Sequence, residues 1–217
     1  MDGMGTGLGR GLVAWLALTM LVGSARADRG PTLLPVPGIR LEAGPHFLLP
    51  QPDAADPAQP VDPLVLPDRG GRLTLGLQLQ VAVLSFSRWN RASAWGLFPE
   101  AGYVYQRRDL GTTALFNLGV GLGYMPSPLV YFAYMPRFVV GRVYGADAGG
   151  NLSPDLYRIA IGLRHGPLVG LLFGILNVEL SHQLLGLEGR QQHEGMLLLG
   201  VDVLRLVILS LVSGSRR

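Results

Sequence analysis

One alternating stretch constrains the fold of this chain more than any other feature. Residues 72–84 (RLTLGLQLQVAVL) have a large apolar side chain at every second position, with Thr, Gly, Gln or Ala in between. Successive side chains of a β-strand point to opposite faces, so this pattern predicts a strand with one apolar face and one small, polar face. The same alternation recurs along the chain, which predicts an all-β protein.

The alternation and the residues between its segments also predict a layout. Eight strands are expected, at residues 39–49, 72–84, 94–107, 112–125, 129–144, 156–164, 168–185 and 194–212. Short turns are expected at 88–93 (RWNRAS), 126–128 (PSP) and 165–167 (HGP), and longer loops at 50–71, 145–155 and 186–193, with 108–111 as one short exception. An even strand number places both chain ends beside the short turns. Pro45 interrupts the first segment, so its place as the eighth strand stays open.

The first 27 residues have the features of an export signal. Arg10 precedes an apolar core at 12–22 (LVAWLALTMLV), and residues 24–27 (SARA) supply small side chains at the −3 and −1 positions. We therefore expect a signal peptide that is cleaved after Ala27. A membrane anchor is the alternative, but the apolar core is short for one.

Three further segments have compositions that do not suit a packed core. Residues 28–38 contain three prolines and are expected to form an extended leader. Residues 50–71 are rich in Pro and Asp and are expected to form a long outer loop, and 213–217 form a basic tail. The predicted barrel therefore occupies residues 39–212.

Composition favours a membrane environment without membrane helices. Hydrophobic residues make up 48% of the chain and charged residues 15%, which is apolar for a soluble domain. No apolar run after the first 25 residues offers a clean membrane helix of ~20 residues. A helical inner-membrane protein, with apolar segments at 168–176 and 196–212, is the alternative.

The alternation alone does not say which face of the sheet is wet. A soluble lipocalin-like barrel would place the apolar face inside. Here the polar face consists mainly of Gly, Ala, Asn and Gln, which fits a crowded interior better than a hydrated wall. Aromatic residues also gather near strand ends, as membrane interfaces favour. The expected aromatic girdle consists of Trp89, Trp95, Tyr105, Tyr124, Tyr131, Tyr144 and Tyr157. These features predict a transmembrane antiparallel up-and-down β-barrel, closed because hydrocarbon offers no partner for unpaired backbone groups.

With these features, the chain resembles the small eight-stranded outer-membrane β-barrel proteins of Gram-negative bacteria, the OmpA-like and OmpX-like class. The resemblance covers 39–212 and rests on the signal peptide, the alternation, the aromatic residues and the turn layout. It implies an outer-membrane location, a structural or surface-interaction role, and outer-membrane lipid and the barrel-insertion machinery as partners. One departure is the end of the chain, because 211–217 contain no aromatic residue and such barrels commonly end their last strand on one.

Charged residues on the polar face are the candidate functional residues. Arg40 and Glu42 belong to the inward set. The candidate lumen charge network consists of Glu100, Arg137, Arg158, Arg164, Glu179 and Asp202. Side chains fill an eight-stranded lumen, so these charges have to pair. We interpret them as a structural plug, with a narrow pore as the alternative.

A lipid-modifying enzyme is a further alternative. Ser181 and His182, with His193 and Glu194, could support hydrolysis as in lipid A deacylases. Adjacent strand residues face opposite sides, so Ser181 and His182 are poorly placed for each other, and we expect no catalytic residue. The chain has no Cys and no cluster that predicts a metal site or a cofactor. Its formal charge of +3 gives no argument for nucleic acid.

Overall fold

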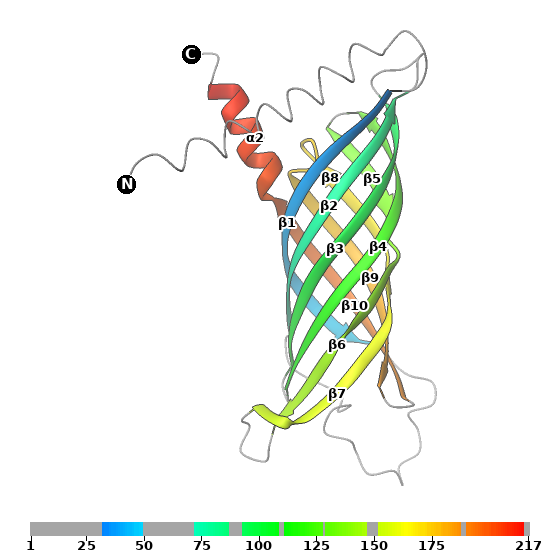
Figure 1. Cartoon of the computed structure of the whole chain (residues 1–217), viewed down its shortest axis with the longest axis vertical. Coiled ribbons are helices and arrows are strands. Elements are labelled where there is room, and N and C mark those ends of the chain that lie inside the picture. The colour runs from blue at the N-terminus through cyan, green and yellow to red at the C-terminus, as the bar shows by residue number, and fades with distance from the viewer. Residues whose placement is uncertain are drawn as a thin grey trace.

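The strands close into a single antiparallel barrel. The structure is a computed structural model, and it describes residues 32–49, 72–86, 93–108, 111–127, 129–146, 152–187 and 190–214. Its elements are β1 (Thr32–Leu48), β2 (Arg72–Phe86), β3 (Ala94–Arg108), β4 (Gly111–Ser127), β5 (Val130–Tyr134), β6 (Arg137–Ala146), β7 (Leu152–His165), β8 (Pro167–Leu171), β9 (Leu176–Leu187), β10 (Arg190–Asp202) and α2 (Val203–Gly214). β10 pairs with both β9 and β1, which closes the sheet (Figure 1). The predicted all-β fold is confirmed.

Ten strand segments form eight spans, because two spans are interrupted. β4 pairs with β5 and then with β6, and β9 pairs with β8 and then with β7. The interruptions, at Met135–Pro136 and at Gly166, lie side by side, where the Met135 amide donates to the Gly166 carbonyl at 2.9 Å. The expected number of eight antiparallel strands is therefore confirmed.

The register gives the tilt of the strands. A row of paired residues that starts at His193 of β10 and follows the sheet through β9, β7, β6, β4, β3 and β2 reaches β1 at Ile39. On the other side His193 lies beside Leu49, so the row has shifted by ten residues along the chain (49 − 39). This shift in an eight-stranded barrel corresponds to a tilt of ~40°, which leaves an interior just wide enough for side chains.

The structure differs from the expected layout in the first span. β1 begins at Thr32 and pairs with β2 from Thr32 opposite Phe86 to His46 opposite Arg72. Most of the segment expected to be a Pro-rich leader is therefore strand. Pro35 and Pro37 are tolerated there because β1 pairs with β10 only from Arg40 onward, which leaves one edge of this part of the strand without a ladder partner among the described residues.

Two further expectations, both toward the end of the chain, are wrong. Residues 165–167 (HGP) were expected to form a turn, but they lie at the interruption between β7 and β8. The turn comes instead at 172–175, where Leu172, Phe173 and Gly174 adopt positive φ angles of 52°, 63° and 77°. Positive φ is uncommon for bulky residues, so among these three residues of the apolar turn Gly174 is the one whose type suits its backbone conformation. The last strand ends at Asp202 and not at 212, because the chain continues as α2.

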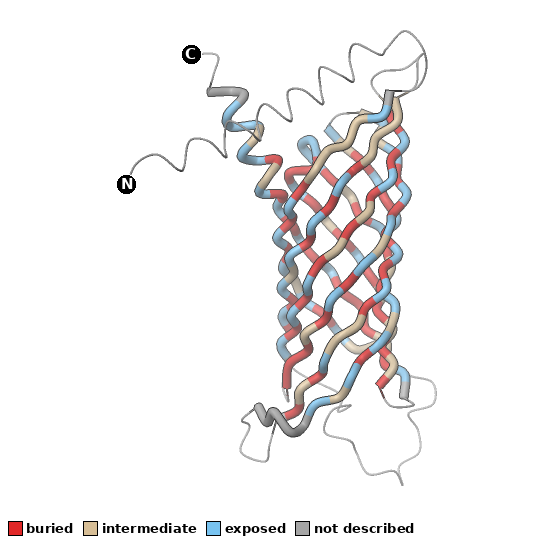
Figure 2. The backbone as a smooth tube through the Cα atoms, in the orientation of Figure 1, coloured by how far each residue is buried: buried red, intermediate tan, exposed pale blue. Residues whose placement is uncertain are grey.

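Burial alternates along every span (Figure 2). In β2, Thr74, Gln78 and Gln80 are buried, whereas Leu75, Leu77 and Leu79 are exposed. The polar residues therefore face the interior and the large apolar residues face outward, which is the reverse of a soluble barrel.

Candidate functional site

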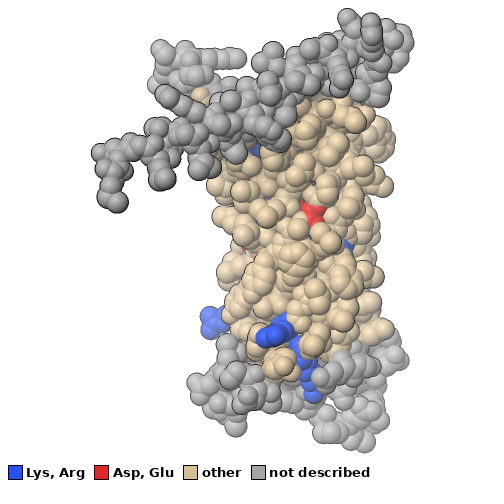
Figure 3. All heavy atoms as spheres, viewed as in Figure 1, with Lys and Arg blue, Asp and Glu red and all other residues tan. Residues whose placement is uncertain are grey.

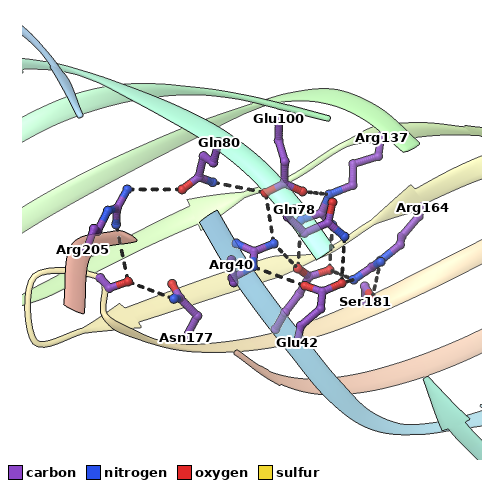
Figure 4. Close-up of polar contacts among 12 residues, drawn as sticks. Arg40, Glu42, Gln78, Gln80, Glu100, Arg137, Arg164, Asn177, Ser181 and Arg205 are labelled. Atoms are coloured by element: carbon purple, nitrogen blue, oxygen red, sulfur yellow. Dashed lines mark hydrogen bonds and ion pairs between the residues drawn. The ribbon is translucent and has the colours of Figure 1, made fainter. Parts of the chain in front are cut away.

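Six charged side chains meet inside the barrel, and Figure 4 labels five of them. They are Arg40 and Glu42 of β1, Glu100 of β3, Arg137 of β6, Arg164 of β7 and Glu179 of β9, all of them buried. They come from five spans, because each lies on the inward parity of its strand and the register brings those positions together. We call these six residues the central network.

Glu179 contacts all three arginines of the central network. Its carboxylate lies 2.7 Å from Arg137 Nη1, 2.7 Å from Arg164 Nη2 and 3.3 Å from Arg40 Nη2. Arg137 also donates through Nη2 to the second carboxylate oxygen at 2.9 Å, so this pair is bidentate. Bidentate guanidinium–carboxylate pairs are among the stronger hydrogen-bonded contacts in proteins.

The other two carboxylates complete a closed set of pairs. Glu100 accepts from Arg137 Nε at 2.7 Å and from Arg40 Nη2 at 3.0 Å. Glu42 lies 3.2 Å from both Arg40 Nε and Arg164 Nη2. Three arginines thus face three glutamates, so the formal charge of the central network is zero. That balance is required of charges that are withdrawn from water.

Neutral polar side chains line the central network. Gln78 Nε2 donates to Glu42 at 2.9 Å, and Gln80 Nε2 donates to Glu100 at 3.3 Å. Ser181 Oγ accepts from Arg164 Nε at 3.2 Å. Small residues make room for these groups: a Cβ on Gly76 would lie 2.5 Å from the Glu42 carboxylate. Gly within these strands therefore serves packing of the interior.

A second charged group lies where β10 ends. Asp202 accepts from the Arg205 backbone amide at 2.9 Å, as an N-terminal cap of α2, and also pairs with Arg205 Nε at 3.2 Å. Arg205 Nη2 reaches Gln80 Oε1 at 3.5 Å. Arg205 is buried although it belongs to the helix, so it joins α2 to the interior of the barrel.

Apolar clusters pack in the interior on both sides of the central network. Toward the short turns lies a cluster of Ala82, Phe98, Tyr131, Ala133, Met135 and Leu168. Toward the longer loops lies a cluster of Val104, Leu115, Val139, Val143, Ala160, Leu185 and Leu187. The central network therefore has an apolar cluster on each side, and beside the loop-side cluster Gln106, Gln183 and Gln192 donate to the buried Glu194 carboxylate.

The structure brings four of the six predicted lumen charges into one network. Glu100, Arg137, Arg164 and Glu179 belong to the central network, together with Arg40 and Glu42 from the inward set. Asp202 lies apart, in the pair with Arg205. Arg158 is six residues from Arg164 along β7, toward the loops, and is only half-buried. Sequence reasoning did not identify the inward position of Arg205, because helical residues do not follow strand parity.

Most of the expected aromatic girdle faces outward. Trp95, Tyr105, Tyr124 and Tyr157 are exposed, and Tyr144 is half-buried. The rings of Trp95 and Tyr124 are 4.9 Å apart, and those of Tyr144 and Tyr157 are 6.3 Å apart.

Two girdle residues differ from this set. Tyr131 is wrong as a girdle residue, because its ring is buried, stacks on Phe98 and donates through its hydroxyl to Asn177 at 2.6 Å. Phe132, its neighbour, has the outward parity instead. Trp89 lies outside the described residues.

A row of polar rings crosses the outer wall. His165 and His182 are paired residues of β7 and β9, with Nε2 and Nδ1 3.2 Å apart, and His182 Nε2 lies 3.1 Å from His193 Nδ1. The Tyr134 hydroxyl lies 2.7 Å from His165 Nδ1. We call these four residues the histidine row. Ser181 is buried on the opposite face of β9 from His182, so the structure does not bring this serine and histidine together.

The central network joins strands through charge pairs, and its charged groups are buried and not presented to solvent.

No family model matches the chain, and neither a curated protein nor a solved structure is significantly similar to it. Among the described residues, no helix is both long and apolar enough to cross a membrane.

Proposed function

We propose that this chain is an integral outer-membrane β-barrel protein without enzymatic activity, of the same general kind as the small OmpA-like and OmpX-like barrels. In this proposal residues 1–27 direct export and are removed. The barrel-insertion machinery and outer-membrane lipid are its partners. The barrel holds its loops at one membrane surface and has a structural or surface-interaction role.

The apolar outer wall is the observation that supports this proposal. Every span exposes large apolar side chains; Leu118 of β4 is 57% exposed and Leu199 of β10 is 62% exposed. A continuous apolar surface of this size would make a soluble protein aggregate, whereas a bilayer needs it. The space-filling view is accordingly almost free of charged atoms over the middle of the wall (Figure 3).

The filled interior supports a structural role over a pore. The central network occupies the middle of the barrel, and an apolar cluster packs on each side of it. A conducting pathway would have to separate the paired charges of the central network and pass the side chains packed on each side of it. This supports the proposal of a closed barrel against the alternative of a narrow pore.

Fluorescence quenching in vesicles tests the membrane proposal. The mature chain has Trp89 and Trp95, so a Trp89→Phe variant leaves Trp95, near the short turns, as the reporter. A Leu118→Trp variant with both native tryptophans replaced reports from the middle of the wall. We expect brominated lipids to quench both reporters, with deep bromines more effective for Leu118→Trp and shallow bromines for Trp95.

The same samples provide the control and the contrary result. A folded barrel should migrate faster in unheated than in boiled gel samples, which shows that the reporters sit in folded protein. If the protein is folded by this criterion and neither tryptophan is quenched by lipid bromine, the wall does not face lipid. The membrane proposal would then be abandoned.

A further inference from the structure

Acidic and basic side chains are distributed differently between the inner and outer faces of the barrel. All carboxylates whose burial is described, those of Glu42, Glu100, Glu179, Glu194 and Asp202, are buried. Among the charged residues whose burial is described, two are exposed, Arg107 of β3 and Arg142 of β6. The outer wall therefore has exposed cationic groups, and none of the carboxylates whose burial is described lies exposed beside them.

Both exposed arginines lie at the loop end of the barrel. Arg107 precedes the short connection to β4, and Arg142 lies four residues before the end of β6. In Figure 3 most of the visible blue atoms gather near this lower end. At the opposite end the described outward residues are uncharged and include Trp95, Tyr124 and Phe173. The two ends of the wall thus differ in charge.

β4 places the two arginines at a common height. Arg107 pairs with Thr112 on one side of β4, and Arg142 pairs with Ala114 on the other. A row of paired residues descends toward the loop end from β3 to β6 because the strands are tilted, and this descent compensates for the two residues between Thr112 and Ala114. Standard strand spacing and rise place the two Cα atoms ~12 Å apart, so both guanidinium groups can reach one headgroup. The wall between them consists of two small side chains.

A tyrosine ring contacts Arg142, and further tyrosines lie close to both arginines. The Arg142 guanidinium lies 5.1 Å from the centre of the Tyr157 ring, so a cation–π contact holds this side chain against the outer wall. Tyr144 packs beside Tyr157, and Tyr105 is an exposed neighbour two residues from Arg107. We call Arg107, Arg142 and these three tyrosines the arginine rim.

We propose that the arginine rim binds the phosphate of an anionic lipid headgroup in the leaflet on the loop side. This proposal rests on the proposed membrane function. Guanidinium groups bind phosphate through paired hydrogen bonds, and tyrosines at this height favour the membrane interface. The ligand is an amphiphile because the next outward residues of β3 and β4, Tyr103 and Phe116, are exposed and largely apolar.

Lipid binding to the folded barrel in neutral detergent micelles tests this proposal. The probe is fluorescent phosphatidic acid, with fluorescent phosphatidylcholine of equal chain length as the uncharged control, and fluorescence anisotropy gives the affinity. We expect tighter binding of phosphatidic acid, weakened about fivefold by Arg107→Gln or by Arg142→Gln. Arg158→Gln removes the same charge from the inward face of the same end and should leave the affinity unchanged.

The contrary results are distinct from failure of the membrane proposal. Equal binding of the two lipids, or equal loss in all three variants, would overturn the assignment of the arginine rim. Release of phosphatidic acid by millimolar inorganic phosphate at constant ionic strength would also overturn it, because the ligand would then be a soluble anion. Insertion into neutral phosphatidylcholine vesicles is measured separately. Its absence would refute the membrane proposal, whereas insertion without lipid preference would refute the arginine rim alone.

Discussion

Arg137 joins two carboxylates of the central network. Its Nε and Nη1 atoms lie 2.7 Å from Glu100 and Glu179, and its side chain is fully buried. Neither glutamate would lose all its partners if Arg137 were removed, since Arg40 also contacts both. Three carboxylates would nevertheless face two arginines, so the interior would hold an uncompensated negative charge.

We therefore expect Arg137→Met to destabilise the barrel by about 3–5 kcal/mol, the usual cost of breaking a buried ion pair by removing one partner. Urea unfolding in detergent micelles, followed by tryptophan fluorescence, measures this. Arg158→Met is the matched control, because Arg158 is half-buried and lies outside the central network. Equal losses in the two variants would contradict the importance of the central network.

Gly170 tests the packing of Tyr131 against the barrel wall. A Cβ at Gly170 would overlap the Tyr131 ring, which is held by Phe98 on one side and by its hydrogen bond to Asn177. At Gly186 the nearest atom to an added Cβ would be the Ile161 carbonyl oxygen, at 3.2 Å. We expect Gly170→Ala to cost about 1–3 kcal/mol of unfolding free energy and Gly186→Ala much less.

The same unfolding measurement compares the two alanine variants. If Gly186→Ala destabilises the barrel as much as Gly170→Ala, steric fit to Tyr131 is not the reason for a glycine at position 170. The expectation depends on the inward direction of Tyr131, so the pair also tests that correction to the aromatic girdle.

At the scale of elements, the histidine row links four strand segments across an otherwise apolar wall. Each ring nitrogen between neighbours has a partner within 3.2 Å. His182 contacts both other histidines, so His182→Leu leaves His165 and His193 without those partners. An unmade hydrogen bond in an apolar environment costs more than the bond contributes.

We expect the single His182→Leu variant to lose about 1–3 kcal/mol of unfolding free energy. The combined variant with all three histidines changed to Leu and Tyr134 changed to Phe should lose less, because no polar group of the row is left unpaired. Unfolding in lipid vesicles measures both. A combined variant less stable than His182→Leu would show that the histidine row has another role.

The boundary between β10 and α2 could not be predicted from the sequence. The apolar residues after Asp202 read equally well as strand or helix, since short apolar segments do not distinguish the two. Asp202 is an N-terminal cap, a recognisable signal, but it also fits the inward parity of β10. Residues 211–217, which contain no aromatic residue, follow α2 or belong to its end, so they are not the end of the last strand, which is Asp202.

At the scale of the whole molecule, the order of layers along the interior determines whether ions can pass. The central network is flanked by the two apolar clusters. Ions would have to pass the packed side chains on each side of the central network and displace its paired charges. A barrel of eight strands has little space for any of these steps.

We therefore expect purified protein in planar bilayers to show no stepwise conductance. A large porin in the same bilayers is the positive control, and heat-modifiable migration shows that the tested sample is folded. Reproducible single-channel steps would contradict a closed interior and would support the narrow-pore alternative.

The sequence by itself determined which side chains share a face. Parity along a strand is a local property, so the outward Leu79 and Leu118 and the inward Arg40, Glu100 and Glu179 could be assigned from the alternation alone. The change of direction between β4, which ends at Ser127, and β5, which begins at Val130, also lies close to the turn predicted at 126–128.

The tertiary structure alone decided which of these residues meet. Contacts such as Arg40 with Glu100 join residues distant in sequence, and they depend on the ten-residue shift that accumulates around the closed barrel. The interruption at Gly166, the apolar turn at 172–175 and the inward Arg205 were likewise found only in the tertiary structure. The total register shift accumulates over all the strand pairings, so the alternation within any one strand does not determine it.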